Sequence, residues 1–240
     1  MKLFNSVAGP AILLGVFVFA SSTPAHADNY SWTTWNSVNA ATLGSATGTI
    51  AGGPTVTYSG ATSGLLTDSP SWTPTGTFSG GSVSNGPVAG DNAIQMEGGN
   101  DWLTETITFS SPVVDPALAI WSLGAAGKTA SFDFTASEPF SVVAGGPSTE
   151  YGGSSIYQFG NNVYGAEGNG VLVFDGTFSS LSFSTPTYEY YFALTVGEDA
   201  TLTTAPTPEP ETLSLLGLGL AGLPFLRASF TNRRRRAVQA

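Results

Sequence analysis

The chain has 240 residues, a formal net charge of −10, no cysteine and a single histidine, His26. Between Asp28 and Pro206 it holds fifteen acidic residues and one basic residue, Lys128. This balance excludes nucleic acid and anionic membrane surfaces as partners of that segment, because binding to either depends on Lys and Arg. The absence of cysteine, and of any histidine after His26, also removes from that segment the usual parts of a zinc site and of a base-assisted Ser or Cys nucleophile.

The amino terminus has the features of a secretory signal peptide. Lys2 gives a positive start, residues 7–20 are almost wholly apolar, and Ala25 and Ala27 place small residues three and one before a cut. The apolar run of about 14 residues is shorter than the ~20 that span a bilayer. We therefore predict a signal helix in residues 1–27 that is removed between Ala27 and Asp28 by signal peptidase after export through the secretion machinery; the alternative is an uncleaved anchor.

The following segment alternates apolar and polar residues with a period of two, which is typical of half-buried strands. The predicted strands cover residues 55–58, 103–109, 117–123, 131–135, 140–143, 156–159, 171–174, 180–184 and 189–196. Glu105 interrupts one apolar face and suggests a position near a sheet edge, whereas Tyr190 is assigned to the apolar face of its strand. Asp175-Gly176 predicts a two-residue hairpin turn, because glycine adopts a positive φ at little cost.

Many short strands separated by Gly, Pro and Asn turns, without a convincing helix, indicate an all-β fold. We predict one antiparallel β-sandwich or jelly-roll-like domain over residues 28–203, referred to below as the body. Disorder is the alternative for a chain this rich in Gly, Ser and Thr, but aromatic residues make up 12% of the sequence and supply apolar surface to bury.

Residues 204–240 contain a linker, an apolar run and an arginine cluster. The membrane segment is predicted as a single hydrophobic helix between Leu213 and Leu226, and the four arginines after it hold that end in the cytoplasm. Its apolar anchor residues are Leu213, Leu215, Leu216, Leu218, Leu220, Leu223, Phe225 and Leu226, and the cytoplasmic anchor is Arg233, Arg234, Arg235 and Arg236. Fourteen residues reach only about 21 Å, so Arg227 has to snorkel or the bilayer has to thin.

Pro208, Glu209 and Pro210, followed by this apolar run and the terminal arginines, resemble the PEP-CTERM sorting domain of exported proteins in exopolysaccharide-producing Gram-negative bacteria. The resemblance implies that an exosortase-type enzyme recognises the tail, cuts near the tripeptide and releases the body to the cell surface. Both prolines restrict the backbone to extended conformations, which suits a protease cleft. The alternative is a rigid linker before an ordinary membrane anchor.

Three function classes remain for the body. The first is a noncatalytic cell-surface or extracellular-matrix protein associated with exopolysaccharide in a biofilm, with no cofactor. The second is a lectin-like module in which tryptophans stack on sugars, either with or without calcium. Its candidate residues are Trp32, Trp35, Trp72, Trp102 and Trp121 for sugars, and Asp91, Asn92, Glu97, Asn100, Asp101, Glu198 and Asp199 for calcium. The tryptophans have an alternative role in the core, and the acids in Gly-rich turns an alternative role as solvated residues.

The third class is a glycoside hydrolase that uses two carboxylates. Fifteen acids supply many pairs, but no pattern distinguishes one pair from another, and Asp133 is interpreted as an outward strand residue. We therefore predict that the protein is not an enzyme and assign no catalytic residue.

Overall fold

The computed structural model describes residues 27–67 and 71–200. The predicted signal helix, the membrane segment, the sorting tripeptide and the arginine cluster lie outside these residues. Within the described part, no helix has the length and apolar character needed to cross a membrane.

The described chain is almost entirely β-strand, which confirms the all-β prediction. The strands are β1 (Tyr30–Asn39), β2 (Ala41–Ile50), β3 (Thr55–Leu66), β4 (Ala93–Met96), β5 (Glu105–Val114), β6 (Ala117–Leu123), β7 (Ala130–Phe134), β8 (Phe140–Pro147), β9 (Tyr157–Phe159), β10 (Asn162–Gly165), β11 (Gly168–Phe174), β12 (Thr177–Ser184) and β13 (Phe192–Asp199). A short 3₁₀ helix, η1 (Thr75–Phe78), lies between β3 and β4. The predicted two-residue connection at Asp175-Gly176 is present, since β11 ends at Phe174 and β12 begins at Thr177, but the predicted hairpin is wrong. Strand β11 pairs with β6 and β8, whereas β12 pairs with β5 and β7, so the chain passes at this turn from one half of the sheet to the other.

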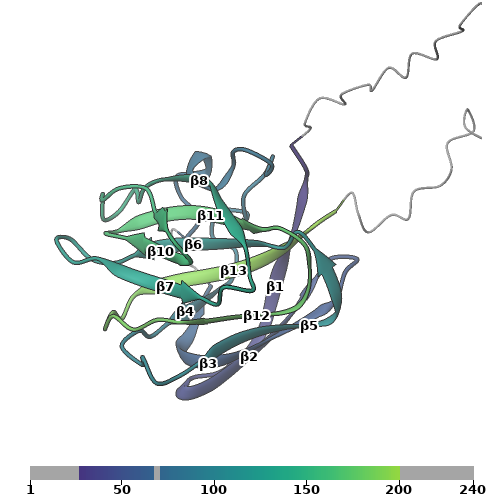
Figure 1. The fold of residues 1–240 in the computed structure, drawn as a ribbon, viewed down its shortest axis with the longest axis horizontal. Helices are drawn as coiled ribbons and strands as arrows, with labels where there is room; N and C mark the ends of the chain where they lie inside the picture. Colours follow the sequence, from purple (N-terminus) through teal and green to yellow (C-terminus); the bar gives the residue numbers. More distant parts are fainter. Residues whose placement is uncertain (1–26, 68–70, 201–240) are drawn as a thin grey trace, which may run out of the picture.

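All pairs of named strands are antiparallel and belong to one hydrogen-bonded sheet. Its order is β8-β11-β6-β13-β1-β2-β3-β5-β12-β7-β10-β9, and β4 pairs with both β13 and β3. Figure 1 shows that this long sheet folds over, so that β8, β11, β6 and β13 lie across from β7, β12 and β5.

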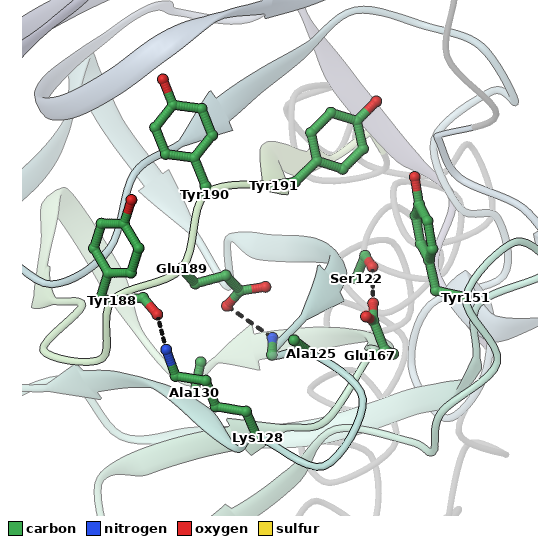
Figure 2. Close-up of a pocket in the computed structure, with 11 residues that line it drawn as sticks. Ser122, Ala125, Lys128, Ala130, Tyr151, Glu167, Tyr188, Glu189, Tyr190 and Tyr191 are labelled. Carbon is green, nitrogen blue, oxygen red and sulfur yellow. Dashed lines mark hydrogen bonds between the residues drawn. The ribbon is translucent and has the colours of Figure 1, made fainter.

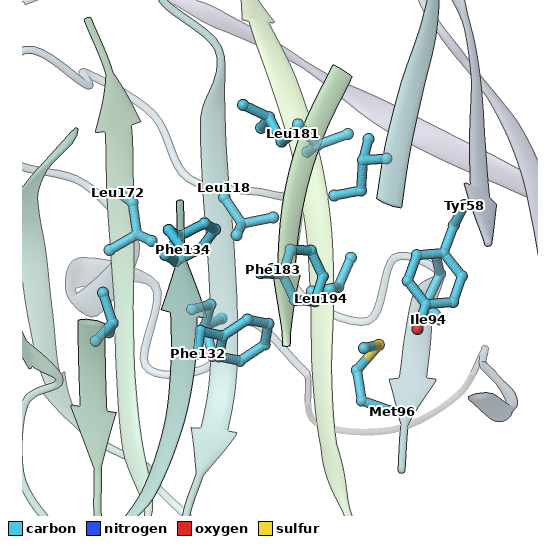
Figure 3. Packing of buried hydrophobic residues seen from close by; sticks show 14 of the residues in the cluster. Tyr58, Ile94, Met96, Leu118, Phe132, Phe134, Leu172, Leu181, Phe183 and Leu194 are labelled. Carbon is cyan, nitrogen blue, oxygen red and sulfur yellow. The ribbon is translucent and has the colours of Figure 1, made fainter. Parts of the chain in front are cut away.

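The main core lies between the two facing halves of the sheet (Figure 3). Phe132 on β7 contacts Phe192 on β13 with ring centroids 5.6 Å apart, and Phe134 contacts Phe174 on β11 at 5.1 Å. These side chains come from opposite layers, so their burial holds the layers together. The aromatic residues at alternating positions of these strands therefore point to one face and form the contacts between the layers.

Strand β6 is buried on both faces, which explains why it reads as a continuous apolar run. Leu118 and Ile120 point into the main core, whereas Ala119 and Trp121 belong to a second cluster on the opposite face. The segment between β3 and β4 covers this opposite face with Trp72 and other apolar side chains.

Two further sequence-based assignments are wrong. Glu105 does not lie at an edge: it is fully buried on β5, which pairs with β3 on one side and β12 on the other. Tyr190 does not face the core, because β13 begins only at Phe192 and Tyr190 is 56% exposed in the preceding loop. Strands β1, β2, β4 and β10 were not predicted.

The first and last strands of the body pair with each other. Tyr30 of β1 lies opposite Asp199 of β13, and the Ala200 N–H donates to the Asn29 carbonyl at 2.8 Å. The amino and carboxyl ends of the described body therefore leave it side by side (Figure 1).

Candidate functional site

Four loops meet at the end of the sheet opposite the two chain ends. They connect β6 to β7, β8 to β9, β10 to β11 and β12 to β13. Strand β13 starts at this end and finishes beside β1 at the other, so at ~3.3 Å per residue its eight residues separate the two ends by roughly 25 Å.

These loops form an open pocket of about 380 Å³, here called the tyrosine pocket. It is lined by Ser122, Gly124, Ala125, Lys128, Ala130, Tyr151, Glu167, Tyr188, Glu189, Tyr190 and Tyr191. The volume falls within the ~300–1,000 Å³ of small-molecule sites. All four tyrosines are more than two-fifths exposed, so their rings are available to a ligand.

A buried indole supports the exposed tyrosines on one side of the pocket. Trp121 is fully buried and contacts Tyr191 and Tyr151 with ring centroids 5.7 and 6.1 Å apart. The two tyrosines meet edge to face at 6.2 Å. These contacts place Tyr151 and Tyr191 in a defined arrangement before any ligand arrives.

Glu189 is the most buried carboxyl group of the pocket, with 8% of its surface exposed. Its Oε2 accepts a hydrogen bond of 2.8 Å from the Gly124 N–H, and Figure 2 shows the group between Tyr188 and the opposite wall of the pocket. Burial raises the pKa of Glu189 to about 7; the nearby Glu167 also raises this pKa, whereas the Gly124 hydrogen bond and Lys128 lower it. Glu189 therefore changes charge near neutral pH.

The opposite wall contains a strained pair. Ser122 and Glu167 both have φ of +57°, in the left-handed region that non-glycine residues rarely adopt. The Ser122 hydroxyl donates to Glu167 Oε2 at 2.6 Å, and the Ser122 N–H donates to Asn169 Oδ1 at 2.9 Å. Such conformations cost about 1–3 kcal/mol each and concentrate at functional sites, which makes this pocket the leading candidate site.

Lys128 brings the only positive side chain of the body to this pocket. Its ammonium donates to the Tyr188 carbonyl and lies 5.5 Å from the centroid of the Tyr188 ring. The tight turn at Ala126-Gly127 fixes its position, because Ala125 and Lys128 exchange two backbone hydrogen bonds across it.

The tryptophans proposed for sugar binding mostly serve the core. Trp35, Trp72 and Trp121 are buried, Trp32 packs against the second cluster, and Trp102 is 66% exposed in the loop before β5. The exposed aromatic surface of the pocket consists of tyrosines instead. The run Tyr188-Glu189-Tyr190-Tyr191 was the sequence signal for these exposed rings. It was missed because residues 189–196 were assigned to a strand.

The residues proposed as calcium ligands do not form one cluster in the structure. Asp91 and Asn92 line a separate small pocket with Thr33 and Thr34, while Glu198 and Asp199 belong to β13. Glu97, Asn100 and Asp101 follow β4 in the chain. Among residues 27–67 and 71–200, no group of three His, Cys, Asp or Glu side chains is placed to hold a metal ion.

The predicted processing residues are mostly outside the described chain. This holds for Ala25, for Pro208, Glu209 and Pro210, and for the membrane and arginine residues listed above. Asp28, which follows the predicted cut, is already part of the body: its N–H donates to the Ser82 carbonyl and its own carbonyl accepts from Ser84, both at 2.8 Å. The cut itself stays a prediction.

Comparison with known proteins identifies the carboxyl-terminal segment. Residues 206–236 match the PEP-CTERM protein-sorting motif, which confirms the resemblance in the sequence. The motif implies an exported protein that exosortase sorts to the surface. No curated protein and no solved structure matches the chain significantly.

Proposed function

We propose that the protein is a noncatalytic cell-surface or extracellular-matrix component whose β-sandwich body associates with secreted polysaccharide through the tyrosine pocket. The observation that carries this proposal is the group of four exposed tyrosines around one pocket, two of them held by the buried Trp121. Aromatic faces pack against the C–H faces of sugar rings, and the carboxyl groups below supply hydrogen-bond partners for hydroxyls.

The position of the pocket supports this role. The chain continues from the end of β13 toward the sorting motif, whereas the pocket lies at the start of β13. A body held to a membrane or surface by its carboxyl end therefore presents the pocket on the far side, roughly 25 Å away along the strand. In this orientation, matrix polysaccharide reaches the pocket without obstruction by the attachment.

Cell fractionation and polysaccharide binding test the proposal together. We expect the mature protein in the matrix fraction, and we expect Tyr151→Ala combined with Tyr191→Ala to weaken retention on purified matrix polysaccharide by about tenfold. Tyr157→Ala is the matched control, because Tyr157 is 54% exposed on β9 and does not line the pocket. Equal loss in the control and the double variant, or a protein confined to the inner membrane, contradicts the proposal.

A glycoside hydrolase is the second candidate, because Glu167 and Glu189 line the same open pocket. Glu189, with its pKa raised to about 7, has the character of a general acid, and Glu167 would be the base or nucleophile. Incubation of matrix oligosaccharides with the protein distinguishes the two functions. Product release that disappears in both Glu189→Gln and Glu167→Gln establishes the enzyme, whereas binding without product release supports the noncatalytic role.

A further inference from the structure

The tyrosine pocket combines aromatic faces with negative charge. Glu167 and Glu189 line it, and Glu150 lies close enough to Tyr151 to act on its hydroxyl: burial raises the pKa of Tyr151, and Glu150 and Glu167 raise it further. Lys128 is the single opposing charge. The carboxyl groups of the pocket would repel an anionic sugar and attract a cation.

The Lys128 side chain already places one ammonium group in the pocket. The Lys128 ammonium lies 5.5 Å from the Tyr188 ring centroid, within the ~6 Å of a cation–π contact, and its hydrogen bond goes to a backbone carbonyl. The pocket therefore provides two features that organic ammonium groups require, an electron-rich ring face and an acceptor oxygen.

Glu189 supplies the third feature. More than nine-tenths of its surface is buried, its Oε2 is held by Gly124, and its Oε1 accepts no hydrogen bond from the described residues. Figure 2 shows the carboxyl group at the centre of the lining residues, with Tyr188 and Tyr190 on one side and Tyr151 and Glu167 on the other. Oε1 is not one of the buried atoms that lack a partner, so it is open to the pocket, where a cation or a hydrogen-bond donor can reach it.

From this geometry we infer that the tyrosine pocket binds a protonated amino sugar, so that the body prefers polysaccharide with free amino groups. The inference rests on the proposed carbohydrate contact and specifies its ligand. The sugar ring packs on Tyr151 and Tyr191, and its ammonium group approaches Glu189 Oε1 and the ring of Tyr188 or Tyr190. N-acetylation removes the positive charge, and the neutral amide loses both interactions.

The pH dependence follows from the groups around Glu189, which are Glu167, Lys128, Tyr188 and the Gly124 N–H. Because the pKa of Glu189 is raised to about 7, the carboxyl group is partly protonated at neutral pH, and a bound cation favours its ionised form. Affinity for a cation should therefore rise between pH 6 and pH 8. Tetramethylammonium suits this measurement because its own charge does not change with pH.

Calorimetric titration of the exported protein, purified after expression of the full chain, tests the inference. The ligands are a glucosamine tetramer, an N-acetylglucosamine tetramer, a glucose tetramer, tetramethylammonium and Nα-acetyl-lysine amide, whose side chain keeps its ammonium group. At pH 6.5 we expect the glucosamine tetramer to bind at least about tenfold tighter than the two neutral tetramers. Glu189→Gln should reduce this preference to about twofold or less, and Lys128→Met should increase affinity for the glucosamine tetramer because a competing cation is removed.

Asp175→Asn is the matched control, since it removes one carboxylate from an exposed turn between β11 and β12, outside the pocket. It should keep the tenfold preference, and equal loss in Asp175→Asn and Glu189→Gln overturns the inference. Equal binding of all three tetramers overturns the inference but leaves the proposed carbohydrate contact intact. Tighter binding of Nα-acetyl-lysine amide than of the glucosamine tetramer overturns the amino sugar as ligand, and failure of every oligosaccharide to bind overturns both proposals.

Discussion

Replacement of Glu105 by glutamine should change how the stability of the body depends on pH. Glu105 is fully buried on β5, its Oε1 accepts a hydrogen bond of 3.2 Å from the Thr185 hydroxyl, and its Oε2 has no hydrogen-bond partner among the described residues. Burial raises the pKa of Glu105 to about 8 from an ordinary 4.5, although the Thr185 hydrogen bond and the nearby polar groups of Ala61 and Tyr58 lower it in part. The folded protein therefore carries this group protonated at neutral pH.

The magnitude follows from proton linkage. Between pH 4.5 and pH 8 the folded state holds a proton that the unfolded state has released, so the free energy of unfolding falls as the pH rises. At about 1.4 kcal/mol per pH unit, Glu105 alone reduces stability by about 4 kcal/mol between pH 5 and pH 9. Most small domains have only about 5–15 kcal/mol in total, so this loss is large.

Urea unfolding followed by tryptophan fluorescence measures the effect, because Trp35, Trp72 and Trp121 are buried and become exposed on unfolding. Glu105→Gln keeps the shape and the Thr185 hydrogen bond but cannot ionise. The variant should be more stable than the native protein at pH 9 by about 4 kcal/mol and should lose most of the pH dependence. Glu189→Gln separates the smaller contribution of the same sign that arises at the pocket.

The reasoning fails if native stability is constant between pH 5 and pH 9, or if Glu105→Gln retains the native pH dependence. It also fails if Asp175→Asn, which removes an exposed acid, reproduces the effect of Glu105→Gln.

Three further predictions address packing, the pocket and sorting. Phe132→Ala should lower the free energy of unfolding by about 3–5 kcal/mol, measured by urea titration, because its fully buried ring joins the two layers. Gly124→Ala should destabilise the body and weaken polysaccharide binding, measured on one preparation: Gly124 has φ of +86°, and an added Cβ would collide with the Gly165 carbonyl. Replacement of Pro208, Glu209 and Pro210 by alanine should leave the carboxyl-terminal segment attached, detected by the intact mass of the exported protein.

The sequence alone predicted those elements whose local pattern is consistent with a single structure. The continuous apolar run at 117–123 predicted β6 with its bounds, and Asp175-Gly176 predicted the two-residue turn after β11, because both signals depend on neighbouring residues alone. The pairing of the strands on either side of that turn could not be predicted in this way, and the expected hairpin is absent. Strand β2 was missed because its inward positions include Gly44 and Gly48, which lack an apolar side chain to mark the buried face. In β1 the buried Thr33 and the register shift between Trp35 and Ser37 interrupt the alternation.

The tyrosine pocket illustrates the opposite case. Glu189 and Tyr191 come from one loop, while Tyr151, Glu167 and Lys128 each come from another, and no spacing in the chain relates them. The alternating run at 189–196 was consistent with a strand, and only the tertiary structure showed that the strand begins at Phe192 and leaves the preceding tyrosines exposed.

By itself, the sequence determined the all-β class, the acidic character of the body and the sorting motif at residues 206–236. These properties depend on composition and on contiguous residues, which a linear chain displays directly. The folding of one sheet over itself, the burial of Glu105 and the meeting of four loops at one pocket were decided only by the tertiary structure. The physical reason is that burial and charge proximity arise between residues distant in the chain, and strand order sets which of them meet.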